Sequence, residues 1–455
     1  MVNKKNMQIR PTYISLFSGA GIGCYGFKLE NFNCISTVEI LEKRLNIQKY
    51  NNKCLFETGY ICGDIREEKI KEKLRSNFDF FKKNLNIKDL DVLIATPPCQ
   101  GMSVANHKKQ NEKGRNSLVI ESIKLTKEFY PKFFIFENVS SFLNTICTDV
   151  DGKDKKISEA IEQNLSGDYN IFSKVINYKN YGNNSSRTRT IIIGVRKDQK
   201  NITPLDLFPE YQEEKTLYEV IGDLPELKKM GEISENDIYH QFKSYSSHMR
   251  DWIKDIKEGE SAFDNKNLNK RPHKIVDGKI IENQNKNGDK YKRQLFNKVA
   301  PCIHTRNDIL SSQNTIHPKD DRVFSIRELM RIMTIPKSFN WTNYKFETLN
   351  NLSFNDKKIF LKKEEMNIRH SIGEAVPTSI FQQIASKIQK NLLDKNLSSK
   401  DIENIINEYN LNDFETLKEF IQNNDLNLNY TTLLTIAEFS NSKRVENSAY
   451  YTSQD

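Results

Sequence analysis

The chain has 455 residues, with 69 Lys and Arg against 60 Asp and Glu, so its formal net charge is +9. This length predicts about three domains, or one large domain with additions. The positive charge favours an anionic partner without identifying it. No apolar run approaches the roughly 18 residues of a membrane span, so we expect no membrane association. We also expect no signal peptide, because the N-terminal segment has no apolar core.

The seven cysteines are odd in number and widely spaced, and no C-x-x-C pair occurs. This predicts reduced thiols and no metal site, rather than a disulfide framework or a zinc knuckle. Charge is distributed unevenly along the chain. Residues 266–298 hold ten Lys and Arg against three Asp and Glu, whereas residues 395–455 hold five against ten. The two segments are therefore expected to have different roles.

Short apolar runs alternate with amphipathic stretches over residues 12–200. The runs are rich in β-branched or aromatic side chains and end near turn residues. Strands that alternate with helices predict parallel βαβ units in an α/β sheet. The strands are expected at Tyr13–Phe17, Cys34–Glu39, Asp91–Ala95, Phe133–Phe136, Ile171–Ile176 and Thr190–Val195, and helices at Ile65–Leu74 and Leu118–Phe129.

The pattern weakens after residue 197, and residues 198–320 are polar and rich in Asn and Lys. A short helix is predicted within residues 216–227. Clearer amphipathic helices are predicted over residues 323–336 and 378–393. The acidic tail beyond about residue 395 shows only short helical patterns and ends in a polar stretch.

A glycine-rich turn follows the first predicted strand. Gly19, Gly21 and Gly23 would let the backbone approach a ligand closely and present amides at a helix N-terminus. Glu39 ends the next strand, 20 residues after Gly19. Its carboxylate could accept hydrogen bonds from both hydroxyls of a ribose. The turn could equally be an ordinary tight βα connection.

NAD binding is the competing interpretation of this turn. The spacing is G-x-G-x-G rather than G-x-G-x-x-G, which argues against it. Asp64 follows the end of a third possible strand and could accept from an adenine amino group, while Ile40 and Ile65 cover the two ring faces. These groups describe an adenosine site without a pyrophosphate, which suits S-adenosylmethionine.

A cysteine follows two prolines where the strand over residues 91–95 ends. Pro97 and Pro98 fix the backbone and remove two donors, so Cys99 is expected on a stiff turn. The carboxyl edge of an open α/β sheet is where ligands bind. Most lone cysteines are small core residues, but a core cysteine has no need of such a rigid turn.

Two further strand ends carry charged side chains. Glu137 follows the apolar strand over residues 133–136. A carboxylate there is expected to be partly desolvated, which favours a proton-donating role, although it could instead cap the next helix. Arg187 and Arg189 alternate on one face at the start of a strand. They could bind a carbonyl or a phosphate, or they could be solvated.

Taken in chain order, these motifs resemble those of the DNA cytosine-5 methyltransferases. The resemblance covers roughly residues 12–200 and 320–393. Six matches carry it: FSGAG (17–21), the nucleophile loop TPPCQGMS (96–103), ENV (137–139), RTR (187–189), the helix VFSIRELMRIMTIPKSF (323–339) that supports the recognition domain, and the cofactor motif IGEAVP (372–377).

The resemblance implies a Rossmann-like, doubly wound, mostly parallel α/β sheet with a smaller target-recognition domain. This is the fold of S-adenosylmethionine-dependent methyltransferases. It implies a catalytic domain over residues 1–199 and a target-recognition domain over 200–320. The chain would return to the catalytic domain over 321–394 and end in an acidic helical extension over 395–455.

The implied activity is sequence-specific methylation of DNA at cytosine C5, as in bacterial restriction-modification systems. The Cys99 thiolate would add to C6 of a cytosine flipped out of the duplex. Glu137 would hydrogen-bond N3 and the exocyclic amine, and Arg189 would hold O2, with Arg187 supporting the loop. S-adenosyl-L-methionine would give up its methyl group and leave as S-adenosyl-L-homocysteine. No metal is required.

The resemblance also implies the residues that contact cofactor and DNA. The implied cofactor contacts are Phe17, Gly19, Gly21, Glu39, Ile40, Asp64, Ile65, Pro98, Leu118, Glu374, Ala375 and Val376. Gln100 and Ser103 would touch DNA beside the flipped base, within a candidate closing lid over residues 100–116. Arg306 would either read a guanine or contact a phosphate. Glu374 departs from the family motif, which has an asparagine there.

The expected partners are double-stranded DNA and a cognate restriction endonuclease. The protein is expected to be a monomer in the cytoplasm, associated with the nucleoid. Two alternatives stay open. A tRNA cytosine-5 methyltransferase of the same family is less favoured, because that branch looks more compact between the arginine pair and the helix at 323. A catalytically silent DNA-binding regulator is the other, and the intact Cys99, Glu137 and Arg189 argue against it.

Overall fold

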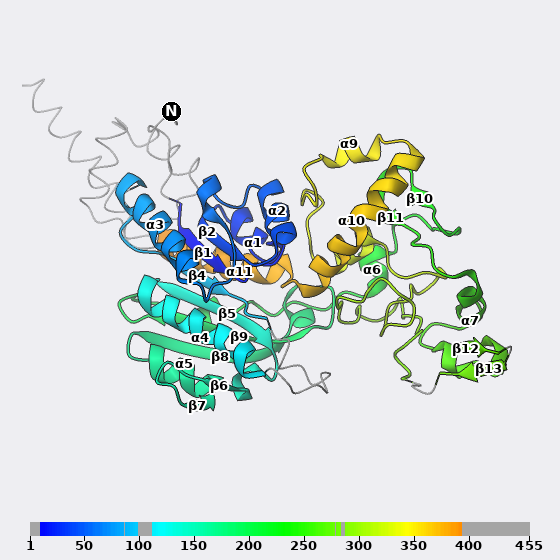
Figure 1. Cartoon of the computed structure of the whole chain (residues 1–455), viewed down its shortest axis with the longest axis horizontal. Helices are drawn as coiled ribbons and strands as arrows, with labels where there is room; N and C mark the ends of the chain where they lie inside the picture. The colour runs from blue at the N-terminus through cyan, green and yellow to red at the C-terminus, as the bar shows by residue number, and fades with distance from the viewer. Residues whose placement is uncertain (1–9, 86, 99–111, 278, 284–286, 394–455) are drawn as a thin grey trace, which may run out of the picture. The chain divides into compact units, whose positions relative to one another are not determined.

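The computed structural model describes residues 10–85, 87–98, 112–277, 279–283 and 287–393 (Figure 1). The chain forms two compact units, Met1–Ala385 and Ser386–Asp455. The first unit contains all of the strands and all but one of the helices that are described. The last helix, α11 (Thr378–Leu393), continues from the first unit into the second.

The first unit is built on a seven-stranded sheet with the order β3-β2-β1-β4-β5-β9-β8. Its neighbouring strands pair in parallel from β3 to β5, and β9 runs antiparallel to both β5 and β8. This confirms the predicted mostly parallel α/β sheet. The strands are β1 (Thr12–Leu16), β2 (Asn33–Glu39), β3 (Tyr60–Cys62), β4 (Val92–Ala95), β5 (Phe133–Val139), β8 (Tyr169–Asn177) and β9 (Thr188–Arg196).

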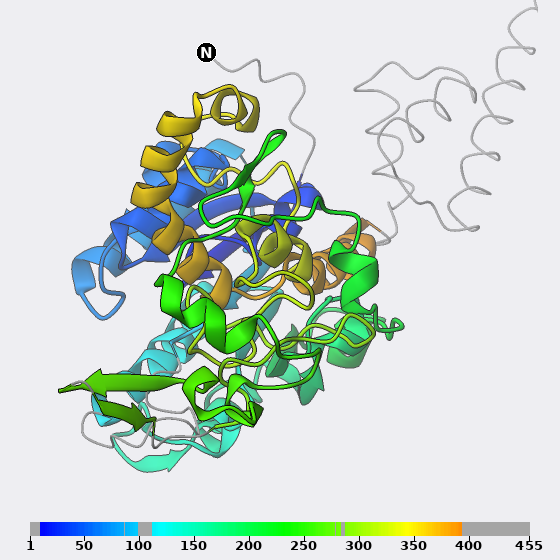
Figure 2. The same cartoon turned by 90° about the vertical axis from the view of Figure 1, so that its right-hand side faces the viewer.

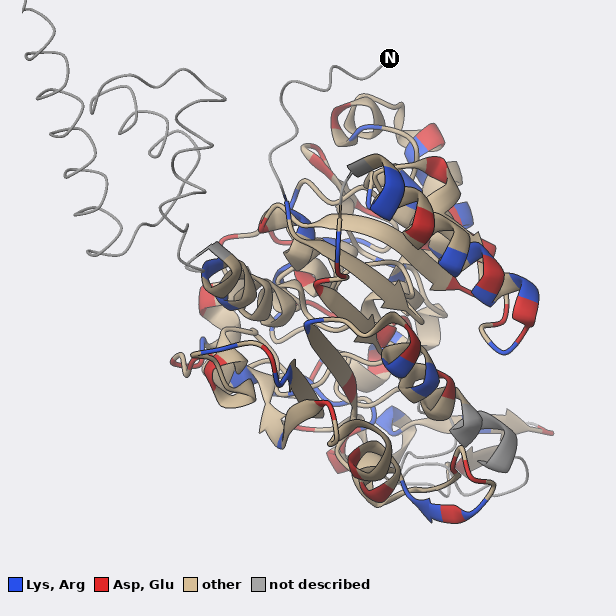
Figure 3. Ribbon diagram, turned by 90° about the vertical axis from the view of Figure 1, so that its left-hand side faces the viewer, with Lys and Arg blue, Asp and Glu red and all other residues tan. Residues whose placement is uncertain are grey.

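Helices cover the sheet, which is why its central strands read as continuous apolar runs. One core cluster joins β1, β4 and β5 to α3, α4 and α5. The outward faces of α3 and α4 carry Lys, Arg, Asp and Glu side by side (Figure 3), and Arg75 of α3 pairs there with Glu128 of α4. These helices are α1 (Tyr25–Leu29), α2 (Glu42–Tyr50), α3 (Glu68–Leu85), α4 (Glu112–Phe129) and α5 (Ile157–Leu165).

Helix α11 packs against α1, although the two are more than 340 residues apart in sequence. The rings of Phe27 and Phe381 lie 6.1 Å apart. Gly26 permits this close approach, because a Cβ there would lie 2.4 Å from the backbone nitrogen of Gln382. The predicted bounds of α11 agree with the structure.

The described part of residues 197–377 forms one long helix, α10, and otherwise short elements, around two further hydrophobic clusters. One cluster joins α6, α8 and α10, and the other surrounds Trp252 and Tyr291. The elements are α6 (Leu217–Ile221), β10 (Ile233–Ser234), β11 (Asp237–Gln241), α7 (Arg250–Ile253), β12 (His273–Val276), β13 (Lys279–Glu282), α8 (Ile326–Ile332), α9 (Phe346–Asn350) and α10 (Phe354–Glu374).

The remaining elements are short. A two-stranded sheet pairs β6 (Ile146–Thr148) with β7 (Asp154–Lys156). The 3-10 helices are η2 (Glu57–Gly59), η3 (Phe142–Asn144), η4 (Tyr178–Tyr181), η5 (Pro204–Leu207), η6 (Ser247–Met249), η7 (Ala262–Asp264) and η8 (Leu268–Lys270).

The 21-residue helix α10 was not predicted from the sequence. Its buried side includes Leu361, Ile368 and Ile372 but also the charged Glu365 and Arg369. Arg369 Nε donates to Glu365 Oε1 at 2.7 Å, which lets both be buried. Charged residues on the buried side hide the helical hydrophobic period. The expected cofactor loop therefore begins inside a helix, since Gly373 and Glu374 are the last residues of α10.

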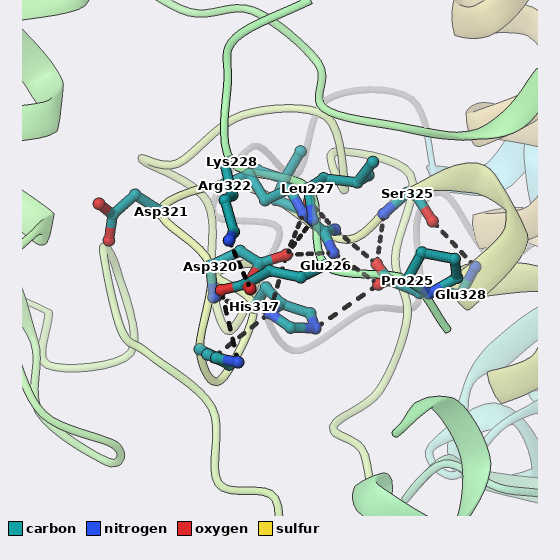
Figure 4. Close-up of polar contacts among 12 residues, drawn as sticks. Pro225, Glu226, Leu227, Lys228, His317, Asp320, Asp321, Arg322, Ser325 and Glu328 are labelled. Carbon is teal, nitrogen blue, oxygen red and sulfur yellow. Dashed lines mark hydrogen bonds and ion pairs between the residues drawn. The ribbon is translucent and has the colours of Figure 1, made fainter. Parts of the chain in front are cut away.

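A buried ionic network precedes α8 and fixes where it begins (Figure 4). Arg322 lies between two carboxylates, with a nitrogen 2.8 Å from Asp320 Oδ2 and another 2.7 Å from Glu328 Oε2. Ser325 and Glu328 form a capping box, so α8 begins at Ile326 rather than at 323 as predicted. Burial alone would raise the pKa of Glu328, but Arg322 outweighs it and the pKa falls well below its usual range.

His317 belongs to the same network. Its Nδ1 accepts the backbone N–H of Asp320 at 2.9 Å, and its Nε2 lies 3.5 Å from Glu328 Oε1. Burial lowers the pKa of His317 to about 3, which the nearby Glu328 carboxylate does not offset. The imidazole is therefore neutral in the folded chain at neutral pH.

The neutral His317 should make the fold sensitive to acid. The unfolded chain takes up a proton at this histidine below about pH 6.5, but the folded chain does not until about pH 3. Stability should thus fall as the pH drops from about 6.5 towards 3, by at most about 1.4 kcal/mol per pH unit from this group. In urea unfolding between pH 7 and 5, the free energy of unfolding of His317→Gln should depend less steeply on pH than that of wild-type protein. The matched change at the exposed His248, His248→Gln, should leave the dependence as it is.

None of the helices in the described part of the chain is long and apolar enough to cross a membrane. Within the same residues, no group of three or more His, Cys, Asp or Glu side chains is placed to hold a metal ion.

Candidate active site

The predicted site residues gather where the parallel strands end. Leu16 of β1 pairs with Ala95 of β4, and Ala95 pairs with Phe136 of β5, so these strands end at one edge of the sheet. Because β9 is antiparallel, its first residues lie at that same edge, and Arg189 pairs with Val139. The glycine turn, the Pro-Pro turn, Glu137 and the arginine pair are therefore brought to one edge.

A carboxylate and a guanidinium meet at the end of β5. Glu137 is 7% exposed, and its Oε1 lies 3.5 Å from Nε of Arg189. Tyr178, which follows β8, donates its hydroxyl to the same Oε1 at 3.2 Å. Burial raises the pKa of Tyr178 well above its usual range, so the hydroxyl stays protonated and acts as a donor. Glu137 and Arg189 thus place a carboxyl group and a guanidinium side by side. Such a pair suits a heterocyclic ligand with polar atoms along its edge.

Sequence reasoning missed Tyr178. It directly follows Asn177, the last residue of β8. Asn177 pairs with Thr188, which lies between the two arginines. The signal that could have found it is its position at a strand end beside that pair. A tyrosine in so polar a stretch, VINYKNYG, carries no hydrophobic pattern of its own.

The Pro-Pro turn is tied to its neighbours on both sides. Asn138 Nδ2 donates to the carbonyl oxygen of Pro97 at 2.8 Å, and Thr96 Oγ1 donates to that of Phe17 at 2.9 Å. The backbone that leads to residue 99 is thus fixed next to Glu137 and next to the glycine turn. Cys99, Gln100 and Ser103 lie outside the described residues.

Arg187 does not reach into the site beside Arg189. It is buried, and its Nη1 donates to the carbonyl oxygens of Ile303 at 3.0 Å and of Gly373 at 3.4 Å. The guanidinium thus joins the start of β9 to the segment around residue 303 and to the end of α10. Gly373 permits the end of α10 to contact the segment around residue 303, because a Cβ at this position would lie 2.4 Å from the carbonyl carbon of His304.

The glycine turn is organised around Glu39. Its Oε2 accepts the backbone N–H of Gly19 at 2.8 Å, and its Oε1 accepts that of Leu41 at 2.9 Å. Each carboxylate oxygen can accept a further hydrogen bond. Gly19 has a φ of +53°, and a Cβ there would meet no atom within 4 Å, so open space borders the turn. These features fit a ribose-bearing ligand beside the backbone.

The side chains expected around an adenine ring differ in exposure. Ile40 is 60% exposed and could cover a ring, whereas Ile65 is 3% exposed and packs in the core of the sheet. Asp64 accepts from Arg66 Nε at 3.0 Å, and this hydrogen bond lowers the pKa of the Asp64 carboxyl. Phe17 and Leu118 are partly buried, and Pro98 is exposed.

The C-terminal motif lies against the glycine turn. A Cβ on Gly23 would approach that of Val376 to 3.0 Å, so only glycine fits without adjustment. Glu374, which replaces the motif asparagine, forms an ion pair with the buried Arg44 of α2 at 3.1 Å. Ala375 caps α10. The sequence did not predict Arg44, whose partner is 330 positions away.

Glu39 should be needed for cofactor binding. Glu39→Gln keeps the shape of the side chain but replaces one carboxylate oxygen by an NH2 group. The NH2 group cannot accept a hydrogen bond, so the backbone N–H of either Gly19 or Leu41 loses its acceptor. Loss of charge-assisted hydrogen bonds of this kind should lower the affinity for S-adenosylmethionine about tenfold or more. Calorimetric titration measures it. The same change at the exposed Glu42 should have little effect, and equal affinities for the two variants would contradict this role.

Arg306 is exposed, and its Nε lies 3.3 Å from Asp308 Oδ1. The segment around it is held to α10, because Asn307 Nδ2 donates to the carbonyl oxygen of Arg369 at 3.0 Å. Its side chain is accessible to a partner, while its backbone is fixed.

The sheet and the groups at its edge define an α/β protein of the methyltransferase fold. The family model for C-5 cytosine-specific DNA methylases matches residues 12–390, and the chain belongs to this family of enzymes.

Individual relatives agree with this assignment. The chain is 30% identical to the type II methyltransferase M1.HgaI of Avibacterium volantium, over 82% of this chain and 97% of that protein. It is 25% identical to the type II methyltransferase M.XorII of Xanthomonas oryzae, over 85% of this chain and 86% of that protein. A DNA modification methyltransferase encoded within an E. coli prophage shares the fold, with a TM-score of 0.56 at 19% identity over 84% of this chain and 98% of the other.

Proposed function

We propose that the chain is a sequence-specific DNA cytosine-5 methyltransferase that acts on a cytosine flipped out of duplex DNA, with S-adenosylmethionine as methyl donor. The observation that supports this best is the pair of Glu137 and Arg189 beside the Pro-Pro turn at the carboxyl edge of the sheet. A cytosine ring presents N3, O2 and an amino group along one edge, and these groups match a carboxyl and a guanidinium.

In the proposed reaction the Cys99 thiolate forms a bond to C6 of the cytosine. Electron density moves to C5 as the Glu137 carboxyl donates a proton to N3, and that proton returns to Glu137 when the thiolate leaves. C5 then gains a methyl group. A base removes the C5 proton, the bond from sulfur to C6 breaks, and the thiolate returns. Free thiols have a pKa near 8.5, so cationic groups close to Cys99 would assist.

The other residues of the edge position these groups. Arg189 would hold O2 of the base, and Tyr178 keeps Glu137 oriented through its hydroxyl. Arg187 is a positioning residue, because it binds backbone carbonyls of the segment around 303 and of α10. Gln100 and Ser103 would contact DNA beside the flipped base.

The cofactor supplies an activated methyl group when it is bound. Gly19, Gly21 and Phe17 would border it, Glu39 would accept from its ribose, and Ile40 would cover its adenine. Asp64 and the residues from Glu374 to Val376 would complete the site. The open space beside Gly19 and the free acceptor capacity of Glu39 support this placement.

The choice of DNA sequence is proposed to lie in residues 200–320, as a target-recognition domain that contains the basic segment 266–298. Residues 321–394 then return to the catalytic domain. We also propose that the enzyme works in the cytoplasm at the nucleoid, where its DNA substrate would lie. We further propose a monomer that works beside a restriction endonuclease.

Methyl transfer from labelled S-adenosylmethionine to plasmid DNA and to tRNA, in competition, tests the proposal. We expect label in DNA alone, and bisulfite sequencing should place it at cytosines of one short sequence. Label in tRNA would show an RNA methyltransferase of the same family. No label in either, with both DNA and cofactor bound, would show a silent DNA-binding protein.

A further inference from the structure

The hairpin of β12 (His273–Val276) and β13 (Lys279–Glu282) has no role in the mechanism above. Four cross-strand pairs join its strands, from His273 with Glu282 to Val276 with Lys279 at the tip. The strands are connected by Asp-Gly, the sequence favoured in two-residue turns, and Asp277 has the positive φ of +51° that such turns require. The hairpin lies next to α7 and away from the seven-stranded sheet in Figure 1.

The root of this hairpin is anchored to a hydrophobic cluster. The ring of His273 lies 5.4 Å from that of Trp252, which is 4% exposed. Asn265 Nδ2 donates to the carbonyl oxygens of Trp252 at 2.9 Å and of Lys270 at 2.8 Å. The root is thus held in place while the strands extend beyond it (Figure 2).

Beyond the root, the hairpin exposes aliphatic side chains on both faces. Ile275 and Ile280 are directly paired on one face and are 70% and 47% exposed. On the other face lie Val276 and Ile281, which are 47% and 49% exposed. An isolated two-stranded hairpin is only marginally stable in water, and it normally buries one face. Four exposed β-branched residues on a rooted hairpin therefore indicate a surface that is covered by a partner.

The charge around these residues identifies the kind of partner. Lys274 and Lys279 share the face of Val276 and Ile281, and neither has an ion-pair partner among the residues that the structure describes. By contrast, Lys270 and Lys292 nearby are paired with Asp255 and Asp289. The hairpin also lies within the segment 266–298, where Lys and Arg exceed Asp and Glu by ten to three. Unpaired ammonium groups beside aliphatic side chains fit a polyanion that also has apolar groups.

Resting on the proposed function, we propose that this hairpin enters the major groove of the DNA substrate, where Ile275 and Ile280 contact thymine methyl groups and Lys274 and Lys279 contact phosphates. The major groove, about 12 Å wide, admits a two-stranded ribbon, whereas the minor groove, about 6 Å wide, does not. Within the major groove the thymine methyl is the apolar group on the base edges. The hairpin is thus a specificity element that favours thymine within or beside the methylated sequence.

The test compares full-length variants on duplexes that carry the sequence mapped by bisulfite. One duplex has thymidine, and the other has deoxyuridine in its place, which removes only the methyl groups. Wild-type protein should bind the deoxyuridine duplex about tenfold more weakly, as expected for two lost methyl contacts. Ile275→Ser/Ile280→Ser should bind the two duplexes equally. The control Leu205→Ser/Ile359→Ser changes two residues of similar exposure and should behave as wild type.

The lysines are tested by salt dependence. Lys274→Gln/Lys279→Gln should reduce the slope of log affinity against log salt by about 2, the value for two phosphate contacts. Lys83→Gln/Lys88→Gln, at exposed sites on and beyond α3, should leave it unchanged. If wild-type protein methylates DNA but ignores the thymine methyl groups, the inference is wrong and the proposed function stands. Wild-type protein that methylates no DNA contradicts the proposed function itself. Binding to phosphatidylserine vesicles that requires Ile275 and Ile280, without sensitivity to the thymine methyl groups, would assign the surface to lipid.

Discussion

Glu137→Gln should lower the rate of methyl transfer by about 10²- to 10⁴-fold, the range of a general acid-base contribution. Glutamine keeps the size of the side chain but cannot provide a proton at N3 of the cytosine. It also ends the ion pair with Arg189, whose Nε lies 3.5 Å from the carboxylate. Single-turnover kinetics with saturating DNA and S-adenosylmethionine measures the chemical step directly.

The affinity for cofactor supplies the internal control for this variant. Glu137 lies at the end of β5, whereas the glycine turn and Glu39 follow β1 and β2. Cofactor binding should therefore stay close to that of wild type, and the loss should appear in the rate alone. The change Glu159→Gln, at an exposed position of α5, should affect neither. A rate for Glu137→Gln within a few-fold of wild type would remove Glu137 from the mechanism.

Arg322→Met should destabilise the fold by about 3–5 kcal/mol, the cost of removing one partner of a buried ion pair. The change leaves Asp320 and Glu328, both almost fully buried, without the cation that lies between them. It also leaves the capping box of α8 beside an uncompensated charge. Urea unfolding at pH 7 measures the loss.

Arg331, which lies on α8 itself, provides the control. Arg331 pairs with Asp223, and their side chains are 35% and 68% exposed, so solvent screens the pair and it should contribute at most about 1 kcal/mol. Arg331→Met should therefore cost far less than Arg322→Met. Arg322→Lys, which keeps the charge, should fall between them. Equal losses for the two methionine variants would show that the buried network does not hold α8.

The strands and the site at their ends were predictable because they depend on local patterns. Continuous apolar runs mark strands that are buried on both faces, and the residues that follow such runs lie at the ligand-binding edge. Glu39, Glu137 and the Pro-Pro turn all follow this rule. The strands of the described chain lie within one to three residues of the positions predicted for them over residues 12–200.

What was missed depends on contacts that no local pattern records. A strand's period does not give its direction, so the antiparallel β9, which places Arg189 opposite Val139, emerged only from the structure. Helix α10 was hidden because Glu365 and Arg369 lie on its buried side. Arg44 and Glu374 form an ion pair although they are 330 positions apart in the sequence. Residues 198–320 fold into elements too short to show a period.

The central claim is that Cys99 attacks cytosine while Glu137 and Arg189 hold the base, and a covalent trap measures it most directly. Duplex DNA with 5-fluorocytosine at the methylated position cannot lose a proton from C5, so the adduct should persist. With S-adenosylmethionine present, wild-type protein should form a complex with this DNA that survives denaturing electrophoresis. Cys99→Ala should form none. A covalent complex with Cys99→Ala, or methyl transfer by wild-type protein without any trapped complex, would contradict the account.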